Sequence, residues 1–483
     1  MLLLCSSVEL YAQKNHKPEK FAKTITAGDL SKHLYILASA EMEGRETAMP
    51  GERKAAAYIE NEFRRIGLLP ANNGSYHLKY FLYQDSLTDA GMKVNGTSFS
   101  LDKDFNPVID ANVEGVFRFS EIVYIGSKAI DSLGKINLAG KLILVKSAPG
   151  RRIPPELINK GVAGILYLST NNYPRKESAD RKSRLISNIY KSSVSPQQYI
   201  ISEAVAKAIM KENYSSDIAS GSVVKSFPAK IELSMKKINL ELETSNVMGM
   251  VEGTDLKDEY LFITSHHDHI GKRGTVINYG ADYDGSGTVG VLEMAEAFAK
   301  AKKEGKGPSR TVVFMTVSGE EKGLLGSEYY SENPVFPMEK TTANLNIDMI
   351  GRIDPKRKNG DSLNYVFVIG DDKLSSDLRP VSEAVNKKYV KMELDYKFND
   401  LSDPNRFYYR SDHYNFARKG VPIIFYFNGT HADYHRPTDT PDKINYPLMA
   451  KRAQLVFYTA WEMANRNEMM KRDIPLDSAM VDR

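Results

Sequence analysis

The chain has 483 residues, of which 42% are hydrophobic and 26% charged, and its formal net charge is +4. This length exceeds one ordinary domain, so we expect two domains of ordinary globular composition. The small net charge and the lack of basic runs argue against a nucleic-acid partner. No apolar run reaches the roughly 18 residues of a membrane-spanning helix.

The first segment, residues 1–20, begins with "MLLLCSSVELYAQ" and holds Cys5, the chain's one cysteine. It is short, apolar and followed by polar residues, which predicts a signal-peptide remnant or a disordered N-terminus. We therefore expect an exported protein, periplasmic or extracellular, with lipid attachment at Cys5 as an alternative. Without this segment the chain has no thiolate, so a bound metal would need His, Asp and Glu ligands.

The next segment predicts a helix in "ERKAAAYIENEFRRIGLLP", residues 52–70. Its apolar residues recur at spacings of three and four from Ala56 to Ile66, which places them on one face. Gly67 and Pro70 are typical of a helix end. An irregular, strand-prone stretch follows to about residue 110.

Residues 110–236 differ from the rest of the chain in their pattern of apolar and polar residues. Short strand-like runs such as "KLILVKSAPG" and "GVAGILYLST" alternate with polar spacers, and "PELINKG" favours a short helix between two of them. This pattern predicts a compact inserted α/β domain. The main domain would then comprise residues 21–109 and 237–473, with a C-terminal tail at 474–483.

From residue 259 onward, strand-like and helical patterns alternate. Strands are expected at "YLFITS", "RTVVFMTV", "NLNI", "NYVFVIG" and "VPIIFYF". Helices are expected at 286–305 and near 324–333 and 377–389. Long apolar strands that alternate with helices predict an α/β fold with a mixed, mostly parallel sheet covered by helices on both faces.

Groups able to bind a metal follow several of these strands. In such sheets, functional sites lie just past the carboxyl ends of the strands. Burying that much carboxylate without a cation would be costly, so the combination predicts a metal site. The groups are His266, His267, Asp268 and His269; Glu320 and Glu321; Asp348; and His431, Asp433 and His435.

These motifs together resemble those of the co-catalytic zinc aminopeptidase family, which includes glutamate carboxypeptidase, glutaminyl cyclase and the transferrin-receptor ectodomain. "SHHDHIG", "GADYDGSG", "SGEEKGLLGS", "NIDMIG" and "DYHRPTDT" occur in the family's order. "EMEGRETAMPGERKAAAYIENEF" is similar to its first helix. The segment 110–236 resembles the protease-associated domain found in many members, and the main domain resembles the zinc exopeptidase fold.

The resemblance implies a hydrolase that removes N-terminal residues from peptides with a zinc-activated water. His266 and His435 would each hold one zinc ion, with Glu321 on one ion and Asp348 on the other. Asp268 would accept the ring N–H of His266 and fix its tautomer. Glu320 would be the general base, which takes a proton from the water and delivers it to the leaving amine.

The turn "GADYDGSG", residues 280–287, departs from the family pattern at Tyr283. In the family, this position carries the aspartate that bridges two metal ions. Asp284, ahead of Asp282, could bridge instead, or the Tyr283 phenol could approach a metal. Otherwise the site would hold one zinc ion instead of two. Ser286 is expected to cap the following helix.

An aromatic segment, residues 402–420, is a candidate substrate pocket, although its aromatic residues could equally be core. With Tyr283, it offers the substrate-binding candidates Tyr409, Arg410 and His413. Aromatic walls would favour apolar or aromatic N-terminal side chains. Arg410 or His413 could meet a substrate carboxylate or a developing oxyanion.

Two alternatives to an aminopeptidase remain at this stage. The first is a catalytically impaired homologue that acts as a binding protein, which Tyr283 favours and the retained Glu320 opposes. The second is a glutaminyl-cyclase-like acyltransferase, because that chemistry shares the fold. A serine hydrolase and a thermolysin-like protease lack their G-x-S-x-G and H-E-x-x-H motifs here. The sequence leaves the oligomeric state open.

Overall fold

A computed structural model describes residues 17–126, 133–134, 136–147, 153–169, 181–190, 194–220 and 224–476. Cys5 and most of the expected signal segment lie outside these residues, as does the end of the expected C-terminal tail. The chain divides into two compact units. Unit 1 comprises residues 1–81 and 243–483, and unit 2 comprises residues 82–242.

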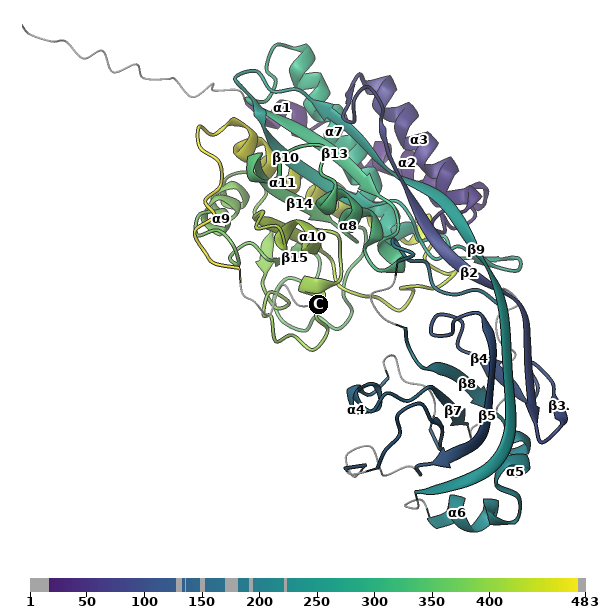
Figure 1. Ribbon diagram of the computed structural model, residues 1–483. Coiled ribbons are helices and arrows are strands. Elements are labelled where there is room, and N and C mark those ends of the chain that lie inside the picture. Colours follow the sequence, from purple (N-terminus) through teal and green to yellow (C-terminus); the bar gives the residue numbers. More distant parts are fainter. Residues whose placement is uncertain are drawn as a thin grey trace, which may run out of the picture. The chain divides into compact units, whose positions relative to one another are not determined.

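Unit 1 is built on the predicted sheet (Figure 1). Strands β10, β13, β14 and β17 are joined by parallel pairings, as are β15 and β16, whereas β9 and β13, and β15 and β17, pair antiparallel. The mixed, mostly parallel sheet is therefore confirmed. In spatial order the strands are β16 (Glu393–Asp395), β15 (Tyr365–Ile369), β17 (Ile423–Phe427), β14 (Thr341–Ile347), β10 (Leu256–His266), β13 (Arg310–Val317) and β9 (Lys225–Val251), with β1 (Leu69–Pro70) beside β9.

Helices cover both faces of this sheet, because successive strand residues point to opposite sides. In β10, Leu261 and Ile263 face one apolar core and Phe262 faces the other. The first core contains residues of α1 (Glu19–Ala22), α2 (Ala27–Leu37), α3 (Pro50–Ile66), α7 (Gly287–Lys303), α9 (Leu378–Tyr389) and α11 (Tyr446–Asn465). The second contains residues of α8 (Leu325–Glu332) and α10 (His413–Ala417).

The predicted helices are confirmed in this unit. Helix α3 buries Ala56, Ile59 and Phe63 and ends at Gly67, whose φ of 85° suits a residue without a side chain. Helix α7 buries the expected apolar face and lies between the sheet and the N-terminal helices (Figure 1). The long helix α11, which the sequence analysis did not anticipate, packs against α2, α7 and α9.

Unit 2 has a sheet in the order β9, β5, β6, β7, β8 and β4, with β2 and β3 forming a hairpin. It extends beyond the expected 110–236 because the long strands β2 and β9 continue without a break from this unit into unit 1. Its elements are β2 (His77–Val94), β3 (Thr97–Phe99), β4 (Phe105–Pro107), β5 (Gly115–Tyr124), β6 (Leu142–Val145), α4 (Pro155–Asn159), β7 (Gly164–Leu168), β8 (Gln197–Ile201), α5 (Glu203–Met210) and α6 (Tyr214–Ser220).

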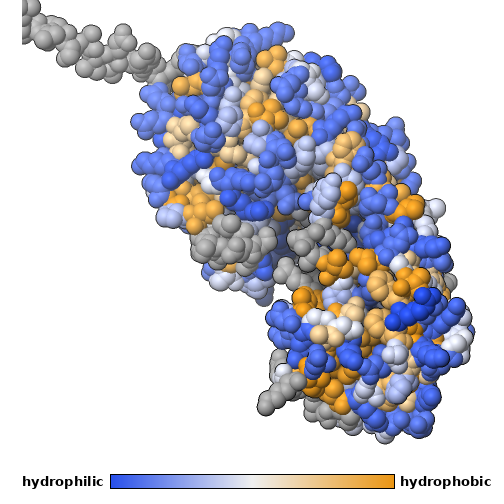
Figure 2. All heavy atoms as spheres, in the orientation of Figure 1, coloured by the Kyte–Doolittle hydropathy of each residue, from blue (hydrophilic) through white to orange (hydrophobic). Residues whose placement is uncertain are grey.

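The visible face of each unit mixes polar residues with scattered apolar groups (Figure 2). No helix among the described residues combines the length and the apolar composition needed to cross a bilayer. The remaining short elements are the strands β11 (Lys272–Arg273) and β12 (Val276–Ile277) and single helical turns at Ala40–Met42, Lys211–Asn213, Ala281–Ser286, Glu320–Lys322, Met338–Lys340, Phe407–Tyr409 and Pro441–Lys443.

Candidate metal centre

The carboxyl ends of three neighbouring parallel strands bring the predicted ligands to one edge of the sheet. His266 is the last residue of β10, Glu320 and Glu321 follow β13, and Asp348 follows β14. His435 comes from the loop after β17. Four of these residues, together with Asp284 and His269, form two sets of three. Within each set, the donor atoms all lie within 4.8 Å of one another. The His266 trio is His266, Asp284 and Asp348, and the His269 trio is His269, Glu321 and His435.

The His266 trio is fully buried in the sheet edge. Its imidazole Nε2 lies 3.8 Å from Asp348 Oδ2. The Asp284 carboxylate accepts hydrogen bonds from the main-chain N–H groups of His266 at 3.2 Å, Gly287 at 2.9 Å and Met349 at 3.0 Å. The start of α7 and the end of β14 thus hold Asp284 beside the other two ligands.

The His269 trio places one carboxylate between two imidazoles. Glu321 Oε1 lies 2.9 Å from His269 Nδ1, and Glu321 Oε2 lies 3.2 Å from His435 Nε2. His269 is fully buried, whereas the His435 side chain is 35% exposed. His269 belongs to the motif "SHHDHIG", whose resemblance to the family implied a role for His266 and Asp268 but not for His269.

Several donor atoms of the two trios are buried without hydrogen bonds to other described residues, which favours a bound metal ion. His266 Nε2, Asp348 Oδ1, both ring nitrogens of His269, Glu321 Oε1 and His435 Nε2 are buried without a hydrogen-bond partner among the described residues. Most buried polar atoms in proteins find such partners. Imidazole nitrogens and carboxylate oxygens are the ligands expected for zinc where thiolates are lacking. The two trios therefore fit zinc.

The electrostatics of this edge favour positive charge. Burial raises the pKa of Glu320 well above its usual range, and Glu321 and Asp348 raise it further. Burial, followed by the charge of Asp348, also raises the pKa of Asp284. Burial opposes protonation of His266, but the charges of Glu320 and Asp348 outweigh it and raise the pKa of the imidazole. All three shifts favour proton uptake, as expected where carboxylates crowd together.

Asp268 positions both His266 and the Glu320–Glu321 turn. His266 Nδ1 lies 3.1 Å from the Asp268 carbonyl and 3.5 Å from its Oδ1. The Asp268 carboxylate also accepts from the main-chain N–H groups of Glu320 at 3.2 Å and Glu321 at 3.4 Å. Burial opposes ionisation of Asp268, but hydrogen bonding to His266 outweighs it and lowers the pKa.

Tyr283 lies among the histidines of both trios. Its ring is 4.9 Å from the rings of His266 and His435 and 5.8 Å from that of His269. Its hydroxyl donates to Glu320 Oε2 at 2.9 Å. The phenol therefore contacts the candidate base, and its hydrogen bond favours the ionised form of that carboxylate.

Asp282 and Ser286 of the same turn belong to neither trio. Asp282 accepts from the main-chain N–H of Gly351 at 2.7 Å and lies 3.1 Å from His431 Nε2, so it does not join the trios as Asp284 does. Ser286 makes no capping hydrogen bond, contrary to expectation. Its hydroxyl instead donates to the Asp282 carbonyl at 2.8 Å and accepts from Ile350 N–H at 2.9 Å.

A small cavity of about 20 Å³, here called the aromatic hollow, opens beside Asp348. Arg410 and Tyr283 are among its lining residues, but Tyr409 and His413 are not. His413 is fully buried, stacks on Phe425 and hydrogen-bonds to the Tyr408 carbonyl, and burial lowers its pKa to about 3. His413 is therefore a core residue. The hollow is lined by Tyr283, Asp348, Met349, Phe407, Arg410, Phe425, Phe427, Thr430 and Tyr434.

The N-terminal segment contributes residues that the sequence analysis did not select. The buried guanidinium of Arg45 donates to the carbonyls of His267, Leu37, Tyr279 and Gly280 at 2.7–2.8 Å. Thr47 donates to Asp268 at 2.7 Å, and Glu52 lies 2.9 Å from His267. The motif "EMEGRETAMPGE" carried the signal for all three residues.

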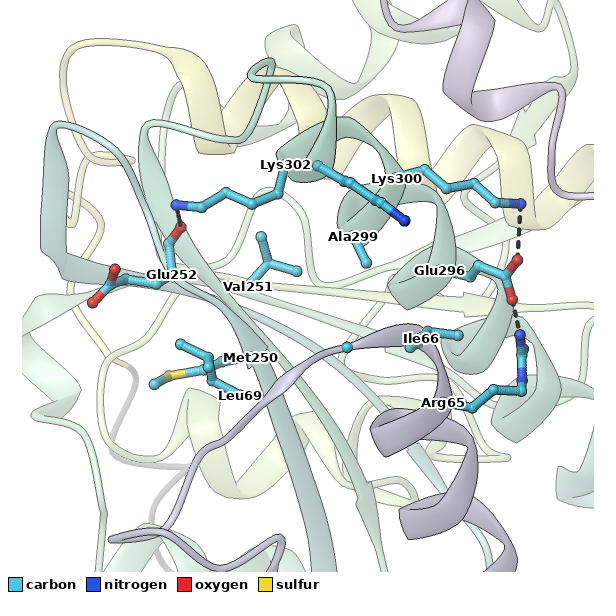
Figure 3. A pocket seen from close by; sticks show the side chains of 12 residues that line it. Arg65, Ile66, Leu69, Met250, Val251, Glu252, Glu296, Ala299, Lys300 and Lys302 are labelled. Atoms are coloured by element: carbon cyan, nitrogen blue, oxygen red, sulfur yellow. Dashed lines mark hydrogen bonds and ion pairs between the residues drawn. The ribbon is translucent and has the colours of Figure 1, made fainter.

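A second cavity of about 610 Å³, here called the basic hollow, is lined by residues of α3, α7 and β9 (Figure 3). Val251, which lines it, pairs with Val312 near the beginning of β13, whereas the trios follow the strand ends. Glu296 pairs with Arg65 at 2.6 Å and Lys300 at 2.8 Å, and Lys302 donates to the Glu252 carbonyl. These lysine and arginine charges thus already have partners.

The part of the chain that carries both trios is similar to known peptidases. The model of peptidase family M28 matches residues 246–460. The chain is 26% identical over 290 residues to a probable leucine aminopeptidase of Arthroderma otae, covering 59% of this chain and 73% of that protein. It is 22% identical to a probable zinc metalloprotease of Pyrenophora teres f. teres, covering 55% of this chain and 60% of that protein.

The fold also resembles a solved aminopeptidase. The structure of an aminopeptidase from Aneurinibacillus sp. strain AM-1 superposes with a TM-score of 0.58 at 19% identity. The similarity covers 95% of this chain and 99% of that one. This likeness concerns the architecture, including the central sheet on which both trios lie.

Proposed function

We propose that this chain, which belongs to peptidase family M28 through residues 246–460, is a zinc-dependent aminopeptidase that removes N-terminal residues from peptides. The observation that supports this best is the position of Glu320. This buried carboxylate lies 3.9 Å from His266 Nε2 in one trio and is followed directly by Glu321 of the other.

The chemistry would be a hydrolysis with Glu320 as the general base. Zinc held by the trios would polarise the substrate carbonyl and lower the pKa of a water molecule. Because Tyr283 occupies Oε2 of Glu320, Oε1 is the atom that would take the proton from water and pass it to the leaving amine. The Asp268 carboxylate keeps Glu320 in place by accepting a hydrogen bond from the main-chain N–H of Glu320.

The aromatic hollow would receive the N-terminal side chain. Its rings favour apolar or aromatic side chains, and Asp348 beside it offers negative charge toward an N-terminal ammonium group. A volume of about 20 Å³ holds little more than one water molecule, so binding requires movement of wall residues. Arg410, which is exposed and stacks over Phe407, is the wall residue with most freedom to move.

The proposal also covers the location of the protein, the identity of unit 2 and the number of metal ions. We propose export of the mature protein, in keeping with the apolar N-terminus. Unit 2 would be a protease-associated domain, in keeping with its small α/β sheet. Each trio would hold one ion, in keeping with its three donors.

The test is release of the first residue from peptides that differ only at their N-terminus. Purified protein should cleave a peptide with a free N-terminal leucine or phenylalanine, and acetylation of that amine should abolish cleavage. Cleavage should stop when zinc is chelated and resume when zinc is returned. No turnover with zinc present would favour the alternative of a binding protein, which the tyrosine at position 283 supports. Pyroglutamate formation from an N-terminal glutamine peptide, without release of a residue, would favour the acyltransferase.

A further inference from the structure

We propose that His269 is a metal ligand and that the His269 trio binds one ion independently of the His266 trio. This inference rests on the proposed zinc-dependent function. It differs from a single centre in which one carboxylate of the Gly280–Gly287 turn is shared by two ions.

The first argument is the environment of His269. Its Nδ1 lies 2.9 Å from Glu321 Oε1, yet neither ring nitrogen makes a hydrogen bond among the described residues. The His269 main-chain N–H donates to the Arg45 carbonyl at 2.9 Å, which fixes the backbone. Gly280 packs so closely that a Cβ there would come within 2.6 Å of His269 Cδ2. The ring is therefore held in place beside the Glu321 carboxylate, without a hydrogen bond to either ring nitrogen among the described residues.

The second argument is the donor set. His269, Glu321 and His435 supply two imidazoles and one carboxylate. This set binds a single zinc ion in several hydrolases and leaves a fourth coordination position open. The partly exposed side chain of His435 would give that position access to solvent. The trio thus has the ligands of a complete single-ion site.

Among the described residues, no member of the turn supplies a ligand atom to both trios. Three main-chain N–H groups hold Asp284 in the His266 trio. Asp282 is held by Gly351 and His431, outside both trios. The ring of Tyr283 lies among the three histidines, and its hydroxyl is engaged by Glu320. The geometry therefore gives each ion its own ligands.

The first experiment measures zinc stoichiometry and affinity by competition with a chromophoric chelator. Wild type should bind two ions in separate steps. His269→Asn should weaken one of them by at least about 100-fold, because losing a direct ligand costs no less than losing its supporting contacts. The other affinity should stay within about twofold. Asp348→Asn should show the reverse pattern.

The matched control is His77→Asn. His77 also lies 2.9 Å from a glutamate, Glu60, but outside both trios, so this variant should keep both affinities. Unchanged zinc binding in His269→Asn would overturn the proposal, as would loss of both ions in either trio variant. If wild type binds one ion only, that ion must depend on His269 and not on Asp348, and the opposite dependence would overturn the proposal.

A second experiment detects the ligand directly and does not depend on loss of binding. His269→Cys loaded with Co²⁺ should show a near-ultraviolet thiolate-to-cobalt charge-transfer band. Wild type, with its native Cys5, and His77→Cys should show none. No band in a folded, cobalt-bound His269→Cys protein would overturn the assignment. Both readouts are metal binding, so a failed peptidase assay leaves them intact, and a failed His269 assignment leaves the peptidase proposal intact.

Discussion

The basic hollow and the edge that carries the two trios both hold charged side chains, but these are balanced in different ways. In the basic hollow, Glu296 lies between Arg65 and Lys300, so opposite charges satisfy each other (Figure 3). Around the trios, acidic side chains gather, and several ligand atoms have no hydrogen-bond partner in the part of the chain that the structure describes. Charges that are satisfied locally serve the fold, whereas buried groups of one sign need an additional ion.

The strongest test of this contrast is Glu320→Gln. The amide keeps the shape of the side chain but cannot take a proton, so kcat/KM should fall by about 10²–10⁴-fold. Zinc content should be unchanged, because Glu320 belongs to neither trio. The measurement is peptide turnover beside metal analysis on the same sample. Wild-type turnover in this variant would exclude Glu320 as the base.

Zinc removal should be the next largest effect. An ion that binds only the folded state contributes about 4 kcal/mol to the free energy of unfolding when its free concentration is about 1,000 times its Kd. Chelation should therefore lower the thermal midpoint, and added zinc should restore it. Differential scanning calorimetry with and without a chelator measures the change. Equal midpoints would mean that the acidic edge is stable without a cation.

Tyr283→Phe sharpens the contrast within the site. A hydrogen bond to a charged group contributes about 1.5–3 kcal/mol, so turnover should fall by roughly 10–100-fold. The lost donor should also raise the pKa of Glu320, because the hydroxyl favours the ionised carboxylate. The acid limb of the kcat/KM profile should therefore move to higher pH. A profile with an unmoved acid limb would show that the phenol does not act on Glu320.

Glu296→Gln provides the smallest expected effect, at the basic hollow. Its partners Arg65 and Lys300 are about half exposed, and such ion pairs contribute about 0–1 kcal/mol. Urea unfolding should show a loss no larger than this, and peptidase turnover should be unchanged. A large loss of turnover would show that the ion pairs of the basic hollow affect the metal centre, which contradicts the contrast drawn between the two regions.

The sequence was sufficient to predict the sheet and the main ligand positions. Strand and helix patterns are local, and the carboxyl ends of parallel strands must meet at one edge. His266, Glu321 and Asp348 could therefore be selected before their contacts were known. The helical face from Ala56 to Phe63 was equally readable, because its spacing repeats within a few turns.

Other features depend on contacts between distant segments. His269 gained a role only when the loop after β17 brought His435 to Glu321. Whether Asp282 or Asp284 faces the metal ligands depends on main-chain donors after β14, which no spacing reveals. The boundaries of unit 2 were also hidden, because β2 continues across its start and β9 continues across its end without a turn.

The contacts of Arg45 have a consequence for the order of events during synthesis. Arg45 and Thr47 emerge early, whereas His435, a member of the His269 trio, emerges near the end of synthesis. At 5–20 residues per second, roughly 20–80 s separate them on the ribosome. Throughout that interval the nascent chain cannot complete the His269 trio. A peptidase whose metal ligands are completed this late would not cleave neighbouring nascent peptides until its own translation is almost finished.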